Sequence, residues 1–376
     1  YMQGIRDYIL LYINGKRHKI YREDAFKSLS DYLRYDKQLV GTKVVCAEGD
    51  CGSCTVIHGM VNIPLAPFKG GSDRNSIDYK IVNSCIKYMY QLDCTHIITV
   101  EGLKNQGCLN PIQESMIKNQ GAQCGFCTPG FVVAMTSLFE NKDKLNQCDL
   151  KDGLTGNLCR CTGYEPIIKA GMDVNSSEVK KINELYPSEP IFQDLQQHLK
   201  SSVLIDTGEK KFFNPVSVES AIKFKNEQQK TVIVSGGTDI SVQMNKRMRD
   251  PDIIMNVGSI DELTQLRVEN NTIIAGARVS LAQLETLAQE FVPEFSKILK
   301  VFGSPQIKNA GTLAGNIANA SPIADTIPFL FVMNAEIELT GLNGKRLVNI
   351  NNFYKGYKVL DLKPDEIIST VFIPLP

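Results

Sequence analysis

The sequence predicts a multidomain α+β protein. Its 376 residues exceed one ordinary domain and suggest two or three. Short β-rich runs dominate the first 93 residues, helical patterns fill the next part, and mixed patterns return from about residue 203. The eleven cysteines all lie before residue 162, and most of them form two groups, one in each of the first two regions. Metal binding is therefore expected in both of these regions.

The composition excludes several classes of protein. Lys and Arg together number 41, as do Asp and Glu, so no basic excess favours nucleic acid. The apolar fraction of 43% and the charged fraction of 22% indicate a globular chain. The longest apolar run, around Phe329–Met333, is too short to span a membrane, and the N-terminus shows no signal-peptide pattern. We expect a cytoplasmic protein that binds neither nucleic acid nor membrane, with its cysteines reduced.

Residues 1–93 predict a small α+β domain. An Asn-Gly pair at 14–15 lies between two β-rich runs and predicts a hairpin over 8–20. Phe26, Leu29 and Leu33 share one face of a helix predicted over 26–36. The remaining elements are a Cys- and Gly-rich loop over 46–54, a strand over 55–59, a surface loop over 66–76 and a final strand over 81–85.

Residues 94–171 predict an all-helical domain. Helices are expected over 111–121, 129–145 and 165–174, each with Pro at or near its first position, where the missing N–H costs little. Residues 172–202 lack Gly, are rich in charge and Ser, and predict a linker. Residues 203–376 then form a third domain, which is again α+β.

The first cysteine group has the spacing of a plant-type ferredoxin. Cys46, Cys51 and Cys54 follow the pattern C-x4-C-x2-C, and Cys85 lies 31 residues further on. Four thiolates hold a 2Fe-2S cluster, and glycines within the loop let backbone amides point at the sulfurs. Zinc is the alternative, but zinc prefers paired C-x2-4-C knuckles, and three ligands within nine residues fit it poorly.

The second cysteine group is ambiguous by its spacing alone. Cys124 and Cys127 precede one predicted helix, and Cys159 and Cys161 precede another. Helix N-termini offer free amides and positive partial charge to an anionic thiolate cluster. Zinc fits the ligand count as well, but the presence of the first group favours a second 2Fe-2S cluster.

No hydrolytic site is apparent in the sequence. It holds no Ser-His-Asp set, paired carboxylate site or metal-hydrolase motif, and we assign no catalytic residue. The residues left without a role are Cys94, Cys108, Cys148 and the four histidines His18, His58, His96 and His198. For these side chains we expect core or solvated positions.

Two glycine-rich loops interrupt the third domain. Residues 231–240, TVIVSGGTDI, predict a strand that enters a glycine turn, and residues 309–322, NAGTLAGNIANASP, form a second loop. The first loop lacks G-x-G-x-x-G, so the Rossmann fingerprint fails. Adjacent glycines still let backbone amides approach a pyrophosphate, and both loops could close on the same phosphates. An ordinary turn is the alternative for each loop.

Four motifs together resemble a known family. They are GTKVVCAEGDCGSCTV at 41–56, NSC at 83–85, QCGFCTPGF at 123–131 and GNLCRCTGYEPI at 156–167. This set is similar to the iron–sulfur part of the molybdenum hydroxylases, the family of xanthine dehydrogenases and aldehyde oxidases. It resembles above all the small subunit of the bacterial xanthine dehydrogenases, and the resemblance spans almost the whole chain. Ala47 and Asp50 stand where many members have Gly, and neither is an expected ligand.

The resemblance implies a fold for each domain. Residues 1–93 would form a β-grasp, ferredoxin-like 2Fe-2S domain, residues 94–171 an all-helical 2Fe-2S-binding domain, and residues 203–376 an α+β FAD-binding domain that is PCMH-like rather than Rossmann. Gln123 corresponds to a glutamine that touches the pterin in relatives. The implied FAD contacts are Ile233, Val234, Ser235, Gly236, Gly237, Thr238, Asp239, Ile240, Phe302, Thr312, Leu313, Ala314, Gly315, Asn316, Asp325 and Ile368. By its position alone, Asp325 fits a helix N-terminal charge equally well.

The resemblance also implies a function. Relatives continue past the strand that ends at residue 376 into a C-terminal flavoprotein subdomain, which this chain is expected to lack. A molybdopterin-binding large subunit in a hetero-oligomer would supply electrons to the second cluster, and these would pass to the first cluster, to FAD and to NAD⁺. The expected role is the electron-transfer subunit of a xanthine dehydrogenase-like oxidoreductase. The alternatives are a stand-alone NADH–dye flavin reductase and a zinc-stapled structural protein.

Overall fold

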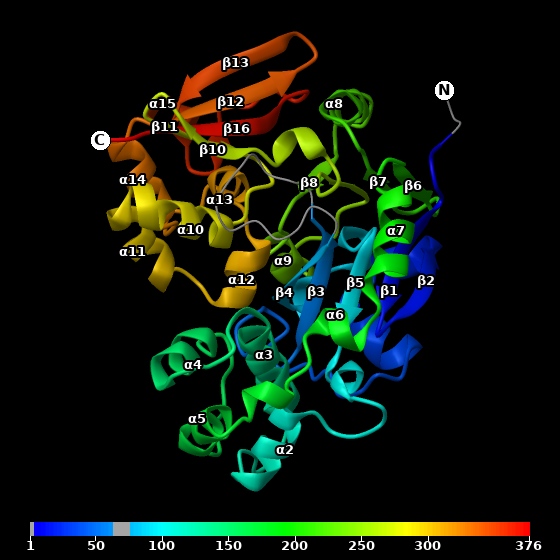
Figure 1. Cartoon of the computed structure of the whole chain (residues 1–376). Helices are drawn as coiled ribbons and strands as arrows, with labels where there is room; N and C mark the ends of the chain where they lie inside the picture. Colours follow the sequence, from blue (N-terminus) through cyan, green and yellow to red (C-terminus); the bar gives the residue numbers. More distant parts are fainter. Residues whose placement is uncertain (1–3, 63–75) are drawn as a thin grey trace.

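The N-terminal unit is a five-stranded mixed sheet in the order β2-β1-β5-β3-β4 (Figure 1). The computed structural model describes residues 4–62 and 76–376 of the chain. The strands are β1 (Tyr8–Ile13), β2 (Lys16–Tyr21), β3 (Thr55–Val61), β4 (Ile77–Asn83) and β5 (Thr95–Ile98). β1 and β5 pair in parallel at the centre, and the other neighbours are antiparallel. This is the ferredoxin-like β-grasp arrangement that the family resemblance implies.

Local signals account for most elements of this unit. β1 and β2 form the predicted hairpin, and Asn14 and Gly15 both take the positive φ that its turn requires. The helix predicted over 26–36 is a series of short turns, η1 (Arg22–Phe26), α1 (Leu29–Asp31) and η2 (Tyr32–Asp36). Ser28 caps α1, because its hydroxyl accepts a hydrogen bond from the Asp31 amide. The surface loop predicted over 66–76 lies almost entirely outside the described residues.

Helices follow the N-terminal sheet, as predicted. They are α2 (Pro111–Lys118), α3 (Thr128–Asn141), α4 (Gln147–Gly153) and α5 (Glu165–Met172), and α2, α3 and α5 each carry Pro in the first turn. The sequence did not indicate α4, which begins with a capping box between Asn146 and Asp149. The segment predicted as a linker holds α6 (Ile182–Leu185) and α7 (Ser188–His198), and α7 packs against β1 and β3.

The chain from residue 203 onward builds two larger sheets and a set of helices (Figure 1). The sheet β6-β7-β9-β8 consists of β6 (Val203–Asp206), β7 (Lys211–Asn214), β8 (Val232–Val234) and β9 (Ile253–Asn256), with α8 (Val218–Glu227) and α9 (Ile240–Asn245) in its crossovers. The antiparallel sheet β10-β11-β16-β12-β13 consists of β10 (Leu266–Glu269), β11 (Thr272–Gly276), β12 (Glu336–Gly341), β13 (Gly344–Asn349) and β16 (Ile367–Pro374). This mixed arrangement confirms the α+β prediction.

Shorter elements complete this region and the connections between units. The helices are α10 (Leu281–Phe291), α11 (Pro293–Val301), α12 (Pro305–Ala310), α13 (Leu313–Asn319), α14 (Thr326–Val332) and α15 (Ile350–Phe353). β14 (Tyr354–Gly356) and β15 (Val359–Leu360) form a small ladder. The 3₁₀ turns are η3 (Ser84–Ile86), η4 (Met89–Gln91), η5 (Val100–Leu103), η6 (Ser176–Glu178) and η7 (Asp261–Leu263).

The two faces of the N-terminal sheet pack against different parts of the chain. Successive side chains of a strand point to opposite faces. Ile57 of β3 and Ile81 of β4 therefore enter a core shared with α3 and α5, whereas Val56 and Val82 enter a core shared with Phe212 of β7. α12 packs directly against β4. The sheet thus lies between the helical unit and the C-terminal region, and the three parts share buried side chains.

A buried ion pair anchors the start of the chain. Arg6 Nη2 lies 2.6 Å from Asp93 Oδ2, and both side chains are almost fully buried. The Arg6 guanidinium also donates to the carbonyl oxygens of His198 and Ser201, at the end of α7. Asp93 in turn accepts a hydrogen bond from the Leu10 amide of β1. Removing one partner of such a pair generally costs about 3–5 kcal/mol, so these contacts hold α7 firmly against the sheet.

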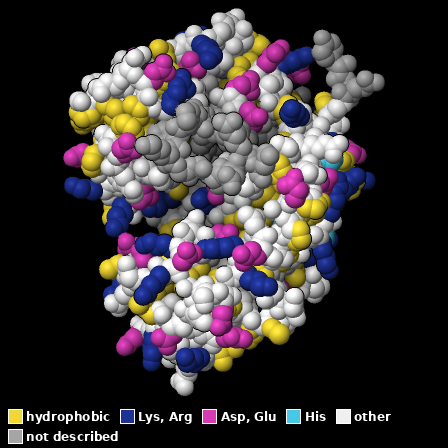
Figure 2. Space-filling view, in the orientation of Figure 1, with side chains coloured by type: hydrophobic (Ala, Val, Ile, Leu, Met, Phe, Trp, Pro, Cys, Tyr) yellow, Lys and Arg dark blue, Asp and Glu magenta, His cyan; other side chains and the backbone are white. Residues whose placement is uncertain are grey.

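The surface agrees with the balanced charge of the sequence. Figure 2 shows acidic and basic side chains mixed across one face of the molecule. All eleven cysteines are free thiols. Among the helices of residues 4–62 and 76–376, none has both the length and the apolar character that crossing a bilayer requires.

His96 of β5 is a core histidine, as its sequence context suggested. Its side chain is fully buried between Tyr12, Tyr79 and Tyr186. The Gly15 amide donates to Nε2 at 3.1 Å, so the ring proton lies on Nδ1 and is directed to the Tyr79 hydroxyl at 2.9 Å. Burial lowers the pKa of His96 to about 4. The imidazole is therefore neutral in the folded protein.

This neutral histidine predicts acid sensitivity. Between pH 6.5 and about 4, the unfolded chain binds a proton at His96 and the folded chain does not, so stability falls as pH is lowered through this range. We expect His96→Phe to be less stable at neutral pH but to lose part of this acid dependence. Denaturant midpoints measured across the range test this expectation. An unchanged pH slope in the variant would contradict it.

Candidate iron–sulfur and flavin sites

The fold gathers the four cysteines of the first group at one end of the β3–β4 ladder. Thr55 pairs with Asn83 at this end, so Cys54 and Cys85 follow directly beyond the last pair. The Ser84 hydroxyl donates to the Cys54 carbonyl oxygen at 2.7 Å and fixes this approach. The Cys85 side chain, which is distant in sequence, thereby reaches the cysteine-rich loop, as the ferredoxin spacing predicts.

Hydrogen bonds within this group favour the thiolate form of Cys46 and Cys54, whereas the same contacts raise the pKa of Cys85, and burial raises that of Cys51. The Cys85 thiol and then the backbone amides around Cys51 lower the pKa of Cys46. The Cys51 amide lies 3.5 Å from the Cys46 sulfur. The Cys85 thiol likewise lowers the pKa of Cys54. Gly49 takes a positive φ of 78°, which bends the loop so that amides face inward, as predicted. The donor set and the inward amides fit a 2Fe-2S cluster.

The four cysteines of the second group meet as two pairs. Cys124 and Cys161 bring their sulfurs to 3.5 Å, and Cys127 lies within hydrogen-bonding reach of Cys159. Cys127 directly precedes α3, whereas three residues separate Cys161 from the start of α5. Within the described ranges, no three His, Cys, Asp or Glu side chains converge around the position of one metal ion. Paired thiols suit a cluster in which each of two irons takes two cysteines.

The pKa values of the second group are shifted in opposite directions. Burial and the neighbouring Cys159 thiol raise the pKa of Cys127 to about 12. Burial opposes ionisation of Cys159 as well, but hydrogen bonds from the side chain and amide of Thr162 outweigh it and lower the pKa of Cys159. A bound metal would remove the protons from all four thiols.

The two groups differ in exposure. Cys54 and Cys85 are buried, and Val242 of α9 and Ile307 of α12 pack over them. Cys124 and Cys161 are exposed at the surface of the helical unit. Gln123, beside Cys124, is exposed as well. The first group therefore faces the C-terminal region, and the second group faces outward.

The two cysteine loops touch through their backbones. The Leu158 amide, next to Cys159, donates to the carbonyl oxygen of Cys51 at 2.9 Å. Gly52 makes this approach possible, because a Cβ there would lie 2.1 Å from the carbonyl oxygen of Gly156. A Cβ on Gly130 of α3 would in turn lie 2.2 Å from the Gly52 carbonyl oxygen. Because these positions are glycines, the two cysteine loops lie closer together than any side chain would allow.

A glutamine from the C-terminal region closes the same junction. Gln306 of α12 is almost fully buried, and its Nε2 donates to Thr55 Oγ1 at 3.1 Å and to Asn157 Oδ1 at 2.9 Å. Asn157 Nδ2 donates to the Gly52 carbonyl oxygen at 3.1 Å. The three parts of the chain thus meet in one hydrogen-bond network between the two cysteine groups. The sequence offered no sign of this network, because its members lie far apart along the chain.

The first glycine loop leads directly to the first cysteine group. β8 enters the turn at Gly236, and α9 follows it. Asn245 at the end of α9 donates to the carbonyl oxygens of Ala47 and Cys85 at 2.7 and 2.8 Å. Lys246 forms an ion pair with Glu48 of the cysteine loop. A six-residue helix therefore connects the expected flavin loop to the expected cluster.

The structure brings the two glycine loops together. A Cβ added to Gly236 would lie 2.1 Å from the Ala310 carbonyl oxygen, and a Cβ added to Gly311 would lie 3.5 Å from Thr238 Oγ1. Gln91 Nε2 of the N-terminal unit donates to the carbonyl oxygens of Ser235 and Gly236. The two loops therefore pack directly on one another at these glycines, which have no side chain to separate them. A shared phosphate site requires the loops to be adjacent in this way.

The remaining expected flavin contacts are distributed around these loops. In the first loop, Ile233 and Val234 lie in β8, Gly237 and Asp239 lie in the turn, and Ile240 begins α9. In the second loop, Thr312 caps α13, and the helix itself contains Leu313, Ala314, Gly315 and Asn316. The Thr326 hydroxyl donates to Asn316 and ties α13 to α14, which Asp325 precedes. Ile368 is buried in β16, and Phe302 packs against the same core just after α11. Of the expected flavin contacts, only Ser235, Gly236 and Thr312 line a cavity between the N-terminal sheet and the C-terminal region.

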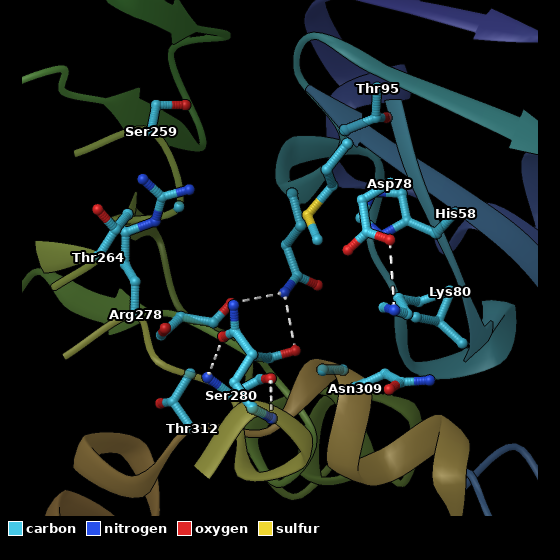
Figure 3. Close-up of a pocket in the computed structure, with 18 of the residues that line it drawn as sticks. His58, Asp78, Lys80, Thr95, Ser259, Thr264, Arg278, Ser280, Asn309 and Thr312 are labelled. Carbon is cyan, nitrogen blue, oxygen red and sulfur yellow. Dashed lines mark hydrogen bonds and ion pairs between the residues drawn. The ribbon is translucent and has the colours of Figure 1, made fainter. Parts of the chain in front are cut away.

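A cavity of about 310 Å³ lies between the N-terminal sheet and the C-terminal region. Figure 3 shows His58, Asp78 and Lys80 on one wall, and Ser259, Thr264 and Arg278 on the other. Burial lowers the pKa of His58 to about 3 and that of Lys87, which also lines the cavity, to about 8. These residues were not predicted as a site, although polar side chains alternate along the strands at 58 and at 78 and 80.

Comparison with known proteins identifies the domains of the chain. Three family models match successive parts of the chain: a 2Fe-2S iron-sulfur cluster binding domain over residues 11–89, a 2Fe-2S binding domain over 99–172, and an FAD binding domain in molybdopterin dehydrogenase over 207–376. The chain therefore consists of the two 2Fe-2S domains and the FAD-binding domain that molybdenum hydroxylases contain. These matches favour the iron–sulfur interpretation of the cysteines over zinc.

The relatives are oxidoreductases of this family. Xanthine dehydrogenase 1 of Arabidopsis thaliana is 30% identical over 435 residues, and the xanthine dehydrogenase of Dictyostelium discoideum is 31% identical over 431 residues. Each match covers 97% of this chain but only 31% of the relative. The chain therefore spans less than a third of the length of these molybdenum hydroxylases.

Solved structures of molybdenum hydroxylases are also similar to the chain. Carbon monoxide dehydrogenase from Hydrogenophaga pseudoflava matches with 26% identity and a TM-score of 0.43, over 44% of this chain and 58% of that chain. Aldehyde oxidoreductase from Desulfovibrio gigas matches with 32% identity and a TM-score of 0.38, over 48% of this chain and 18% of that chain.

The junction between the cysteine loops predicts an unusually costly glycine substitution. In Gly52→Ala the new alanine has to keep the positive φ of this position, which costs about 1–3 kcal/mol, and its Cβ also forces the Gly156 backbone away. Gly208→Ala is the matched control, since Gly208 has a φ of +87° but open space around it. We expect Gly52→Ala to lose about 1–3 kcal/mol more than the control in denaturant unfolding. Equal losses would show that the loops are not in tight contact.

Proposed function

We propose that the chain is the electron-transfer part of a xanthine dehydrogenase-like molybdenum hydroxylase. Electrons would arrive from a molybdopterin centre on a partner subunit, pass the two iron–sulfur sites in turn, and leave through FAD to NAD⁺. The hydroxylation itself would take place on the partner. The observation that carries this proposal is the linear order of exposed cysteines, buried cysteines and glycine loop in one packed body.

Each cofactor has a set of residues that would hold it. Cys46, Cys51, Cys54 and Cys85 would hold one 2Fe-2S cluster, and Cys124, Cys127, Cys159 and Cys161 the other. FAD would be held by the two glycine loops, at residues 233–240 and 312–316, with Phe302, Asp325 and Ile368 nearby. When bound, the clusters supply one-electron steps and the flavin supplies the exchange with two-electron chemistry.

The chain's own residues would shorten the path between these sites. The Leu158–Cys51 hydrogen bond joins the ligand loops without an intervening side chain. Gln306 and Asn157 hold the three parts in register around it. On the far side, Asn245 fixes α9 against the Cys85 loop, so the glycine turn cannot move independently of the first site.

The surface around the second group would receive the partner. Phe126, Leu158 and Tyr164 surround these cysteines and are large, exposed apolar or aromatic side chains. Gln123 lies exposed beside Cys124, where the family resemblance implies contact with the pterin. We infer a hetero-oligomer in which the molybdopterin-binding subunit covers this surface. A cytoplasmic location is part of this proposal, and the eleven free thiols are consistent with it.

Anaerobic redox titration tests this proposal. The protein reconstituted with iron, sulfide and FAD should be brown and should take up one electron per cluster and two per flavin from dithionite. Under the proposal, a molybdenum-containing subunit copurifies, and NADH reduces the flavin. A zinc-loaded, colourless protein would refute the redox role. Rapid NADH–dye reduction with no copurifying subunit would instead support the stand-alone reductase.

The ligand sets predict a selective effect of a single cysteine. Cys127→Ser should abolish one of the two cluster signals in electron paramagnetic resonance and leave the other, because the two sets share no residue. Cys148→Ser is the control, since this exposed thiol belongs to neither set, and it should keep both signals. Persistence of both signals in Cys127→Ser would contradict the assignment.

A further inference from the structure

The cavity beside the first cluster site is built from one face of the β3–β4 ladder. His58 of β3 pairs with Lys80 of β4, and both point to the face opposite Ile57. On this face Val56 and Val82 belong to an apolar core at the cluster end of the ladder. Further along, the apolar core gives way to polar side chains and the cavity opens. The sheet thus changes from a packing surface to a binding surface within a few residues.

Two nitrogen groups in this wall have no partner among the described residues. The Lys87 side chain is only 8% exposed, and its ammonium group makes no hydrogen bond or ion pair with a described residue. His58 is 4% exposed, and its Nε2 is buried without a hydrogen bond. A buried cation without a counter-ion is costly, and such groups are normally paired. A ligand that supplies negative charge would remove this cost.

The acids that line the cavity are already engaged. Asp78 lies 3.3 Å from Lys80 Nζ. Asp93 is held by Arg6 and by the Leu10 amide. Neither carboxylate therefore neutralises Lys87.

The opposite wall adds donors. The Arg278 guanidinium lines it and donates to the Ile260 carbonyl oxygen at 2.9 Å, with Asp261 at 3.7 Å. Ser259, Ser280 and Thr312 contribute hydroxyl groups (Figure 3). Cationic side chains and hydroxyl donors converging on one small space are the donor set of an anion site.

We propose that this cavity binds a phosphate group, with Lys87 as its principal partner and His58, Lys80 and Arg278 around it. A volume near 310 Å³ is at the lower end of small-molecule sites and suits inorganic phosphate or the phosphate end of a nucleotide rather than a whole dinucleotide. Of the expected flavin contacts, only Ser235, Gly236 and Thr312 line this cavity, and its charged residues belong to none of them. The phosphate would therefore belong to a ligand separate from the FAD of the proposed function.

The test compares two equally buried lysines in the full chain. Lys87→Met removes the unpaired ammonium, and Lys225→Met is the control, since Lys225 is also 8% exposed but contacts Pro364 away from the cavity. Inorganic phosphate is titrated by calorimetry against chloride at equal ionic strength. We expect Lys87→Met to weaken phosphate binding at least about tenfold, and the control to leave it unchanged.

Thermal unfolding supplies a second readout. Without phosphate, Lys87→Met should melt at the same temperature as the unsubstituted protein or higher, because an uncompensated buried charge has been removed. Phosphate should raise the melting temperature of the unsubstituted protein only. If Lys87→Met does not fold, Lys80→Met at the half-buried edge of the cavity should still weaken phosphate binding. Phosphate binding that is absent from the unsubstituted protein, or unchanged in both variants, would overturn the proposal.

Repeating the titration with FAD separates this site from that of the flavin. Phosphate binding that FAD does not alter would support a separate ligand. Competition between FAD and phosphate would overturn it, because the site would then be that of the cofactor's pyrophosphate. Failure of FAD to bind would refute the flavin part of the proposed function and leave the phosphate result standing.

Discussion

The close approach of two loop backbones is the constraint on which the arrangement depends. Gly52, Gly130 and Gly156 leave no side chains between the cysteine loops, and the Leu158 amide can therefore reach the Cys51 carbonyl oxygen. The exposed and the buried cysteine groups become neighbours only because of this contact. An electron carrier needs its centres close together, so the glycines serve the proposed function through packing rather than through chemistry.

Period-two alternation in one sheet organises the rest of the molecule. One face of β3 and β4 packs on the helices that carry the second cysteine group. The other face packs against the C-terminal region at one end of the ladder and lines the cavity at the other end. A single ladder therefore positions the first cluster site, the helical unit and the proposed phosphate site. Gln306 and Asn157 link these parts where they meet.

Much of the local structure followed from the sequence. The Asn14–Gly15 hairpin, the Pro-initiated helices and the strand before the glycine turn were predicted because neighbouring residues determine them. Residues 172–202 were predicted as a linker, yet α7 forms there because its buried side chains pack against the N-terminal sheet. The cavity was missed because Lys87, Arg278 and Thr312 are distant in sequence and only the packing of two regions unites them.

The sequence by itself indicated an iron–sulfur site at the first cysteine group, since the spacing of three thiols within one loop is a local property. It also determined which segments could bend around a cluster or a phosphate, because glycine permits backbone angles that other residues avoid. Tertiary structure alone decided which cysteine group is buried and which thiols pair. It also placed Lys87 in the wall of a cavity, with no ion pair to a residue in the described ranges. These outcomes depend on contacts between residues separated by tens or hundreds of positions, and no local pattern encodes them.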